Sequence, residues 1–350
     1  MITETGRRRR PKELTLEQIG ERAGVSRSTV SRVLNDHPDV RPEVRDRVTA
    51  VIRETGYRPN QAARALVSSR TGLVGLVMVT EVDELFGDPY YSALVNGIRV
   101  GCAEHDLIFA MFPAFGPDGS SDMLSPQITQ GFVDGVIVTA GPRSDQLIST
   151  LRDRGQHAVV VGHPADDRDL VRVDVENRTG SAMVVAHLCG HGHRRVGFVG
   201  PTPEHRFGAE RLDGYRAALD AAGVEVDERL VHLDHPDADG GYRAATALLA
   251  ERPDAIYAAT EPMAEGTYRA LAEHGLRIPR DVAVASFDGI PRGPRLEPAL
   301  TTAVQPVFDV GRTAVDLLVG HPDPPTLVVL PTTLRLGASC GCETRPDPST

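Results

Sequence analysis

The sequence lacks the features of membrane proteins and of disulfide-stabilised secreted proteins. Its 350 residues include no tryptophan, only 4 cysteines and no apolar run approaching the roughly 20 residues that span a bilayer. Residues 1–12 carry four consecutive arginines but no apolar stretch, so we expect no secretory signal. Four cysteines in a chain of this size do not form a disulfide framework. These absences favour a reduced, cytoplasmic protein.

The cysteines also give little indication of a metal site. Cys102 and Cys189 lie in apolar helical patterns, where a buried thiol is expected. Cys340 and Cys342 lie near the C-terminus, and no histidine or further cysteine close to them in the sequence completes a tetrahedral ligand set. We therefore expect no metal and no cofactor.

Motifs of enzymes are missing as well. Residues 72–75 do not form the phosphate-binding glycine pattern after a first strand, and the histidines show no zinc-protease or triad-like grouping. The Gly-His-Gly-His run at 190–193 is expected at a helix terminus rather than at a metal. An enzyme with a doubly wound fold, or a periplasmic-type small-molecule binding protein, stays open as an alternative.

Charge is distributed unevenly along the chain, although the formal net charge is −10. Residues 1–70 hold 15 Lys+Arg against 9 Asp+Glu, whereas the remainder holds 23 against 39. A basic head on an acidic body indicates that only the head meets phosphate groups.

The basic head has the pattern of a helix-turn-helix over residues 14–58. Thr15 and Gln18 form a capping box at the start of one helix, and Gly24 suits the left-handed end of that helix. Ser26 is a second N-cap, and a third helix runs from Pro42 to the stop at Gly56. The helix after Ser26 is short enough for a major groove, which favours DNA binding over a merely solvated helix face.

Residues 59–70 form a candidate hinge. Pro59 breaks the third helix, and the helical composition that follows is too short to be stable alone in water. The segment is either a simple linker or a helix that orders on DNA with Leu66 as a minor-groove wedge.

The body, residues 71–337, alternates apolar runs of strand length with amphipathic helical stretches. Such alternation predicts an α/β fold of parallel sheets covered on both faces. We expect strands over residues 73–79, 107–111, 135–138, 158–162, 196–199, 255–258 and 282–285. We expect helices over residues 91–104, 145–154, 178–191, 210–222 and 263–273.

The head resembles the lactose-repressor (LacI/GalR) family over residues 15–35, 56–60 and 63–66. In that family the helix that begins at Ser26 reads the major groove, so the resemblance implies base readers at Arg27, Ser28 and Arg32. It implies phosphate or backbone contacts at Thr15, Ser26, Thr29, Ser31 and Asn35, and hinge contacts at Asn60, Ala63 and Leu66. This resemblance favours the DNA-ordered hinge over the simple linker.

Two features of the head lie outside the family pattern. The basic tail over residues 1–13 contains the Arg7–Arg10 run, which is either a disordered solvated tail or a source of added non-specific phosphate contact. Arg41 stands where the family usually caps the third helix with serine, so we expect weaker capping there.

For the body, the resemblance implies two Rossmann-like lobes similar to periplasmic sugar-binding proteins. We place the three crossovers near Asp174, Gln305 and Gly320. Lobe 1 then comprises about 71–173 and 305–319, lobe 2 about 174–304 and 320–337, and residues 338–350 form a tail. Ligands of such sheets bind outside the carboxyl ends of the strands, here in the cleft between lobes.

The family resemblance also implies an effector site. The matching positions are Glu81, Tyr90, Tyr91, Asp174, Arg211, Tyr257, Thr260, Glu261, Asp288 and Gln305. An arginine, an aspartate and an aromatic plate suit a polyhydroxyl ligand such as a sugar. The alternative is an internal Arg211–Asp288 salt bridge with the tyrosines in the core.

Two acidic departures leave the ligand open. Glu261 stands where the family often has aspartate, and Glu81 stands where a small residue is usual after the first strand. The effector is therefore either a cationic, amino-sugar or nucleoside-like molecule, or a plain sugar bound differently.

The function implied is that of a non-enzymatic transcriptional regulator, expected to be a repressor. One helix-turn-helix reads only a half-site, so we expect a homodimer on a pseudo-palindromic operator, with a tetramer as the alternative.

Overall fold

The computed structural model describes residues 14–34, 37–57, 71–78, 88–113, 132–142, 144–164, 166, 168–290 and 296–342. The chain divides into two compact units, Met1–Thr71 and Gly72–Thr350. No helix within these described ranges is long and apolar enough to cross a membrane.

The first unit is a three-helix head comprising α1 (Leu16–Ala23), α2 (Arg27–Leu34) and α3 (Pro42–Thr55). The predicted capping box is confirmed, since the Thr15 hydroxyl accepts from the Gln18 amide at 3.3 Å and the Gln18 side chain accepts from the Thr15 amide at 2.9 Å. Gly24 ends α1 with φ +64°. The Ser26 hydroxyl accepts from the Thr29 amide at 3.2 Å and so caps α2.

The core of the head is small and depends on close backbone approach. Ile19, Val30 and Val48, one from each helix, are fully buried. A Cβ on Gly20 would lie 2.7 Å from the Val25 carbonyl oxygen, so glycine there lets α1 meet the turn. Arg41 makes no side-chain cap to α3, as its departure from the family pattern predicts.

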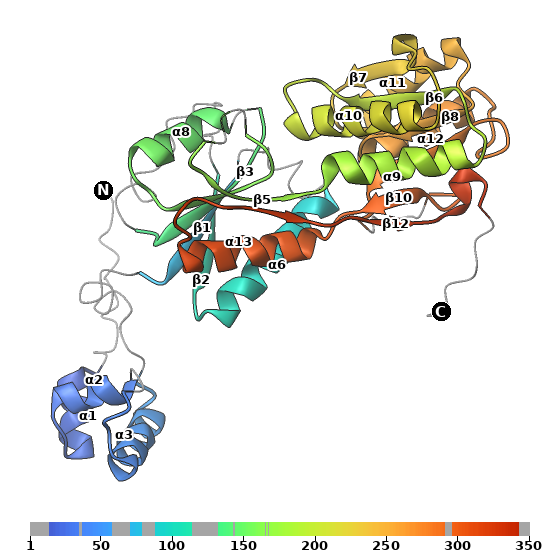
Figure 1. The fold of residues 1–350 in the computed structure, drawn as a ribbon. Coiled ribbons are helices and arrows are strands. Elements are labelled where there is room, and N and C mark those ends of the chain that lie inside the picture. Colours follow the sequence, from blue (N-terminus) through green and yellow to red (C-terminus); the bar gives the residue numbers. More distant parts are fainter. Residues whose placement is uncertain are drawn as a thin grey trace, which may run out of the picture. The chain divides into compact units, whose positions relative to one another are not determined.

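The second unit consists of two six-stranded sheets, which define its two lobes (Figure 1). The lobe 1 sheet has the order β11-β5-β4-β3-β1-β2, and all its strands are parallel. The lobe 2 sheet has the order β12-β10-β9-β8-β6-β7, and only β12 is antiparallel to its neighbour. The strands are β1 (Leu73–Met78), β2 (Ile108–Pro113), β3 (Gly135–Thr139), β4 (Ala158–Val161), β5 (Val171–Val175), β6 (Val196–Pro201), β7 (Val231–Asp234), β8 (Ala255–Ala258), β9 (Ala283–Asp288), β10 (Thr301–Val304), β11 (Leu327–Leu330) and β12 (Thr333–Arg335).

Helices cover the sheets, and the interior strands are nearly continuous apolar runs, as expected for parallel sheets buried on both faces. The α-helices are α6 (Pro89–Glu104), α8 (Asp145–Asp153), α9 (Asn177–Gly190), α10 (Arg206–Ala221), α11 (Ala238–Leu248), α12 (Glu261–Glu273) and α13 (Val307–Gly320). Short 3-10 turns are η2 (Glu228–Leu230), η3 (Leu249–Glu251) and η4 (Ala338–Cys340). The pairs α6–α13, α9–α10 and α11–α12 pack against each other (Figure 1).

One glycine sets the distance between α9 and α10. A Cβ on Gly214 of α10 would lie 2.2 Å from the Arg178 carbonyl oxygen of α9. Only glycine allows this approach, which holds the face of α10 that carries Arg211 against the start of α9.

The predicted fold class is confirmed, but the third crossover is misplaced in the sequence-based prediction. The chain passes between lobes after β5, near Asp174, and after β10, near Gln305, as expected. It does not cross near Gly320, because β11 pairs with β5 in lobe 1 and the return to lobe 2 falls between Leu330 and Thr333. Both strands are short and half exposed, so no hydrophobic pattern marks their sheet.

The predicted tail is also packed at its start. In η4, Ser339 is fully buried, and its hydroxyl donates to the Val284 carbonyl at 2.6 Å. Cys340 is 1% exposed. The fold brings His187 and His191 of the α9 region to Cys340 and Cys342, although no histidine lies close to these cysteines in the sequence.

Candidate functional site

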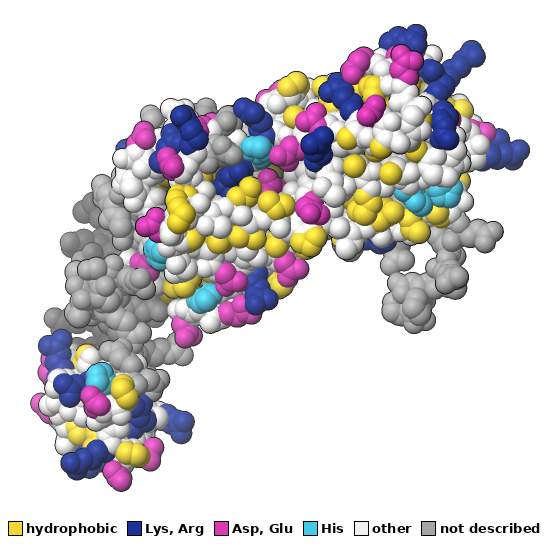
Figure 2. Space-filling view, viewed as in Figure 1, with side chains coloured by type: hydrophobic (Ala, Val, Ile, Leu, Met, Phe, Trp, Pro, Cys, Tyr) yellow, Lys and Arg dark blue, Asp and Glu magenta, His cyan; other side chains and the backbone are white. Residues whose placement is uncertain are grey.

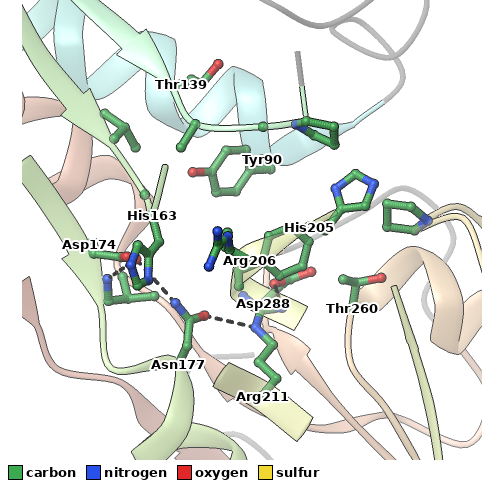
Figure 3. A pocket seen from close by; sticks show the side chains of 18 of the residues that line it. Tyr90, Thr139, His163, Asp174, Asn177, His205, Arg206, Arg211, Thr260 and Asp288 are labelled. Carbon is green, nitrogen blue, oxygen red and sulfur yellow. Dashed lines mark hydrogen bonds and ion pairs between the residues drawn. The ribbon is translucent and has the colours of Figure 1, made fainter. Parts of the chain in front are cut away.

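A cavity of about 570 Å³ lies at the carboxyl ends of strands from both lobes (Figure 3). Thr139 ends β3, Asp174 lies near the end of β5 and Asp288 ends β9. A parallel sheet leaves its strand ends open at one edge, so two facing sheets create a cleft that both lobes line. The volume lies within the range of pockets that bind drug-sized ligands.

The ion pair between Arg211 and Asp288 forms the floor of the cavity on the lobe 2 side. Arg211 Nη1 lies 2.9 Å from Asp288 Oδ1, and the two side chains are 4% and 14% exposed. Arg211 also donates to the Ala259 carbonyl at 2.6 Å and to Asn177 Oδ1 at 3.0 Å. Its guanidinium lies 3.7 Å from the centroid of the Phe287 ring. The arginine is therefore fixed in orientation before any ligand arrives.

The Asp288 carboxylate accepts hydrogen bonds from three separate parts of the chain. Besides Arg211, the Gln305 amide donates to Oδ1 at 2.8 Å and the backbone amide of Glu261 donates to Oδ2 at 3.1 Å. The Glu261 amide lies at the N-terminus of α12, where the helix dipole favours an anion. Asp288 adopts φ +90°, a strained conformation for a non-glycine residue that is typical of functional sites.

Aromatic rings line the cavity beside these charges. Tyr90 and Tyr91 meet edge to face with centroids 5.3 Å apart at the start of α6, and Phe207 comes from α10. The Asp88 carboxylate caps α6 by accepting from the Tyr90 amide at 2.9 Å. Burial raises the pKa of the Tyr90 hydroxyl, which stays protonated and can donate to a ligand. Figure 3 shows Tyr90 across the cavity from Arg211.

A second polar network joins the lobes at one side of the cavity. His163, which follows β4 of lobe 1, is hydrogen-bonded to Glu210 of α10 in lobe 2, with Nδ1 2.7 Å from Oε1. The Asn177 amide donates to Glu210 Oε2 at 3.0 Å and to Asp174 Oδ1 at 3.2 Å. Burial raises the pKa of the Asp174 carboxyl, and the nearby Glu210 raises it further. These contacts hold the two walls of the cleft together.

The structure places most of the sequence-predicted effector residues together. Those that line the cavity are Tyr90, Tyr91, Asp174, Arg211, Thr260, Asp288 and Gln305. The two alternatives from the sequence, an effector site and an internal salt bridge, do not exclude each other. The Arg211–Asp288 ion pair is internal, and both residues also line the cavity.

Two predicted residues do not line the cavity. Tyr257 is fully buried, and its hydroxyl is hydrogen-bonded to Ser181, because the side chain points into the layer between β8 and α9. Glu261 is 9% exposed, and its carboxylate accepts from the Ile290 amide at 2.9 Å, which directs it to the loop after β9. Glu81 lies outside the described residues.

Several residues that line the cavity were not predicted from the sequence. They are Thr139, Asp145, His163, Asn177, Glu204, His205, Arg206, Phe207 and His235. His163 follows a predicted strand and Asn177 follows a crossover, so the rule that ligands meet strand ends could have indicated both. Nothing local to the sequence marks the segment 204–207, whose position depends on the lobes facing each other.

The outer face of α2 carries the predicted DNA-reading residues. Arg27, Ser28 and Arg32 are exposed, while Val30 and Val33 on the opposite side are buried. Arg27 Nε forms an ion pair with Glu17 of α1 at 3.1 Å, with both side chains more than half exposed. Thr15 and Ser26 are occupied as helix caps, and Thr29 and Ser31 are half-buried. The predicted residues Asn35, Asn60, Ala63 and Leu66, and the Arg7–Arg10 run, lie outside the described residues.

Comparison with known proteins agrees with both units. Residues 15–60 match the family model of bacterial regulatory proteins of the lacI family, and residues 185–340 match a periplasmic binding protein-like domain. The chain is 37% identical to the HTH-type transcriptional regulator CelR of Thermobifida fusca over 342 residues, covering 95% of this chain and 99% of that protein. The chain belongs to the LacI family of bacterial regulatory proteins.

Solved structures of this LacI-family architecture also match. A transcriptional regulator CelR–cellobiose complex is 34% identical, with a TM-score of 0.72 over 93% of this chain and all of that chain. The lac repressor dimer bound to operator and an anti-inducer has a TM-score of 0.77 over 94% of this chain and 99% of that chain; at 24% identity it shows the fold alone. The relatives of this chain are transcriptional regulators. The chain is likewise a regulator, with a DNA-binding head and a periplasmic-binding-like core.

Replacing Asp288 with asparagine should destabilise the core. The substitution leaves the buried Arg211 guanidinium without its counter-charge, and breaking one side of a buried ion pair costs about 3 kcal/mol. The matched control is Asp239→Asn, whose pair with Arg269 is exposed (73% and 45%) and should contribute less than about 1 kcal/mol. Urea unfolding of both variants measures the difference, and equal losses would contradict a structural role for the Arg211–Asp288 pair.

Replacing Asp174 with asparagine should stabilise the protein at neutral pH. Since the folded-state pKa of Asp174 is raised above 3.8, its ionised form opposes folding at neutral pH, and this penalty disappears as pH falls through the raised value. The gain in Asp174→Asn should therefore shrink as pH falls. Asp281→Asn should do the opposite, because Arg277 lowers the pKa of Asp281 to about 2 and its stabilisation is present above 3.8. Unfolding free energies from pH 7 to pH 2 test both signs, because the Asp281 contribution is lost only between 3.8 and about 2. Effects of the same sign in the two variants would contradict the prediction.

Proposed function

We propose that this LacI-family regulator is a cytoplasmic homodimeric repressor that binds a pseudo-palindromic operator and responds to a neutral sugar, with a glucose disaccharide such as cellobiose as the first candidate. The observation that carries the proposal is the cleft that holds Arg211, Asp288 and Gln305 opposite Tyr90. Charged and amide groups of fixed orientation suit vicinal hydroxyls, and a ring beside them suits the apolar face of a sugar.

The size and composition of the cavity support a ligand larger than one sugar ring. Polar side chains are spread from Thr139 on lobe 1 to His235 on lobe 2, within a volume of about 570 Å³. A ligand that reaches both ends would touch both lobes and stabilise their closed arrangement. The CelR relative that was solved with cellobiose covers nearly this whole chain, which supports a disaccharide.

The position of Glu261 argues for a neutral sugar over a cationic effector. The sequence left a cationic ligand open partly because of this residue, yet its carboxylate is directed to the Ile290 amide and not into the cavity. Asp288 is already neutralised by Arg211.

The homodimer is proposed from the family and supported by an apolar face of lobe 1. Phe308 and Val319 of α13 are 36% and 40% exposed, and Leu327 and Val329 of β11 are each 47% exposed. Figure 2 shows apolar side chains exposed in a band over this part of the core. Exposed apolar patches of this kind mark protein interfaces, and two-fold pairing would match a two-fold operator.

For the head, we propose that Arg27, Ser28 and Arg32 read base edges. Arginine forks match the acceptor pair of guanine in the major groove. The Arg27–Glu17 ion pair is exposed and therefore weak, so it can be exchanged for a DNA contact. From the family resemblance, Thr15, Ser26, Thr29, Ser31 and Asn35 would hold the backbone, and Asn60, Ala63 and Leu66 would serve the hinge.

Replacing Arg27 with alanine should weaken binding to the specific operator by about 10-fold to 100-fold and relax base preference. The matched control is Arg53→Ala on the exposed side of α3, which removes the same charge without a base contact. The operator is first identified by sequencing genomic fragments bound by the purified protein, and affinities are then measured by fluorescence anisotropy. Equal losses in both variants would contradict base reading by α2.

Calorimetric titration tests the effector class. Cellobiose should bind the wild-type protein, whereas ribose, an amino sugar and a nucleoside should bind more weakly or not at all. Tyr90→Ala should lose about 10-fold or more in affinity because the ring contact is removed, while Tyr242→Ala, which changes a half-buried tyrosine of α11 outside the cavity, should bind normally. Preferential binding of the amino sugar or nucleoside would overturn the neutral-sugar proposal.

A further inference from the structure

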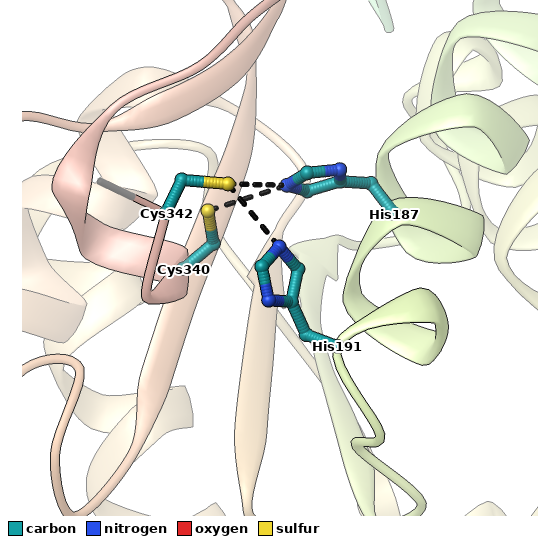
Figure 4. Close-up of side chains that lie close together, drawn as sticks. All are labelled: His187, His191, Cys340 and Cys342. Carbon is teal, nitrogen blue, oxygen red and sulfur yellow. Dashed lines mark hydrogen bonds between the residues drawn. The ribbon is translucent and has the colours of Figure 1, made fainter. Parts of the chain in front are cut away.

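Two histidines and two cysteines from distant parts of the chain meet on lobe 2 (Figure 4). His187 lies on α9 and His191 caps its end, so the spacing of four residues places both rings on one side of the helix. Cys340 ends η4, and Cys342 follows after Gly341, whose φ of +92° turns the chain. About 150 residues of sequence separate the pairs, which is why motif searching does not connect them.

The ligand atoms of this histidine–cysteine cluster have nearly tetrahedral spacing. His187 Nε2 lies 3.3 Å from Cys340 Sγ and 3.4 Å from Cys342 Sγ, and His191 Nε2 lies 3.2 Å from Cys342 Sγ. All four atoms lie within 4.8 Å of one another. Zinc–nitrogen and zinc–sulfur bonds of about 2.0–2.3 Å give ligand–ligand edges of about 3.3–3.8 Å in a tetrahedron. Figure 4 shows both Nε2 atoms and both sulfurs directed at one point between α9 and the C-terminal segment.

The chemistry of the donor set selects a thiophilic ion. Two imidazoles and two thiolates form a common structural zinc set, and four protein ligands leave no open coordination position. Oxygen-seeking ions such as magnesium or calcium do not prefer these donors.

The surroundings support a built site rather than a chance meeting. The Thr301 hydroxyl donates to Cys340 Sγ at 3.0 Å, the kind of outer contact that orients a metal ligand. Cys340 is buried and His191 is exposed, so a metal would sit at the edge of the protein with access from solvent. The other cysteines, Cys102 and Cys189, are also free thiols but have no place in the cluster.

We propose that His187, His191, Cys340 and Cys342 bind a structural zinc ion that joins the C-terminal segment of the chain to α9. The site is separate from the effector cavity, because His187 lies ten residues, or about 15 Å, along the helix from Asn177 in the cavity wall. A metal bond between segments this far apart in sequence stabilises the fold by restricting the unfolded chain, as a cross-link does. It would also anchor the far end of the helix whose first residue contacts Arg211.

The test uses the full-length protein, stripped with EDTA under reducing conditions, supplied with zinc and freed of excess metal by gel filtration. Elemental analysis should find about one zinc ion per chain. Cobalt in place of zinc should give the visible absorption of tetrahedral cobalt together with a near-ultraviolet thiolate band. Zinc should raise the Tm, and EDTA should reverse the rise.

Cys342→Ser and His191→Ala change the more exposed ligands, so both variants should fold. Each should lose zinc affinity by about 100-fold or more, and the double variant should retain no zinc and show no zinc-dependent rise in Tm. The matched control is His193→Ala, two residues beyond His191, whose ring pairs with Asp254 at 3.6 Å; it should bind zinc as the wild type does.

Three results would overturn the proposal. One is a wild-type protein that retains no zinc after gel filtration, and another is unchanged zinc content in the double variant. The third is a Cys340–Cys342 disulfide found by mass spectrometry in protein kept reduced and supplied with zinc.

Discussion

The buried pairing of Arg211 with Asp288 is the interaction on which the core most depends. Two charges this deeply buried are tolerated only when each is neutralised and its remaining hydrogen-bonding capacity is satisfied. That requirement ties α10 to the end of β9, to the first turn of α12 and, through Gln305, to a crossover between lobes. The strained backbone of Asp288 is held by the same contacts. The polar groups that a ligand meets are therefore oriented before it binds.

Helix α9 links this interaction to the rest of the core. It begins at Asn177, which contacts Arg211 and the interlobe pair of His163 with Glu210, and it ends beside the histidine–cysteine cluster. Since α9 packs against α10, a shift of the lobes at the cleft must either move the two helices together or break the contacts at the first turn of α9. A ligand that binds one arrangement of the lobes more tightly than another would act through these contacts.

The head and the fold class could be predicted from local sequence patterns, whereas the long-range contacts of the core could not. The capping box depends on Thr15 and Gln18, which are three residues apart, so the sequence alone predicts it. Arg211 and Asp288 could be predicted because each matches a short motif of the family, and their internal salt bridge was one of the two alternatives that the sequence left open. Tyr257 was misassigned because a strand residue of either face fits the pattern, and the side chain turned out to point into the core. The crossover after β11 and the His163–Glu210 contact depend on tertiary pairing, which no local pattern records.

The most direct test is to measure the thermodynamic linkage between sugar binding in the cleft and operator binding by the head. Operator affinity should be measured by fluorescence anisotropy over a range of cellobiose concentrations, and sugar affinity by calorimetry with and without saturating operator. If the cleft regulates the head, the sugar should change operator affinity at least fivefold, and the operator should change sugar affinity by the same factor. Sugar binding that leaves operator affinity unchanged would contradict the account.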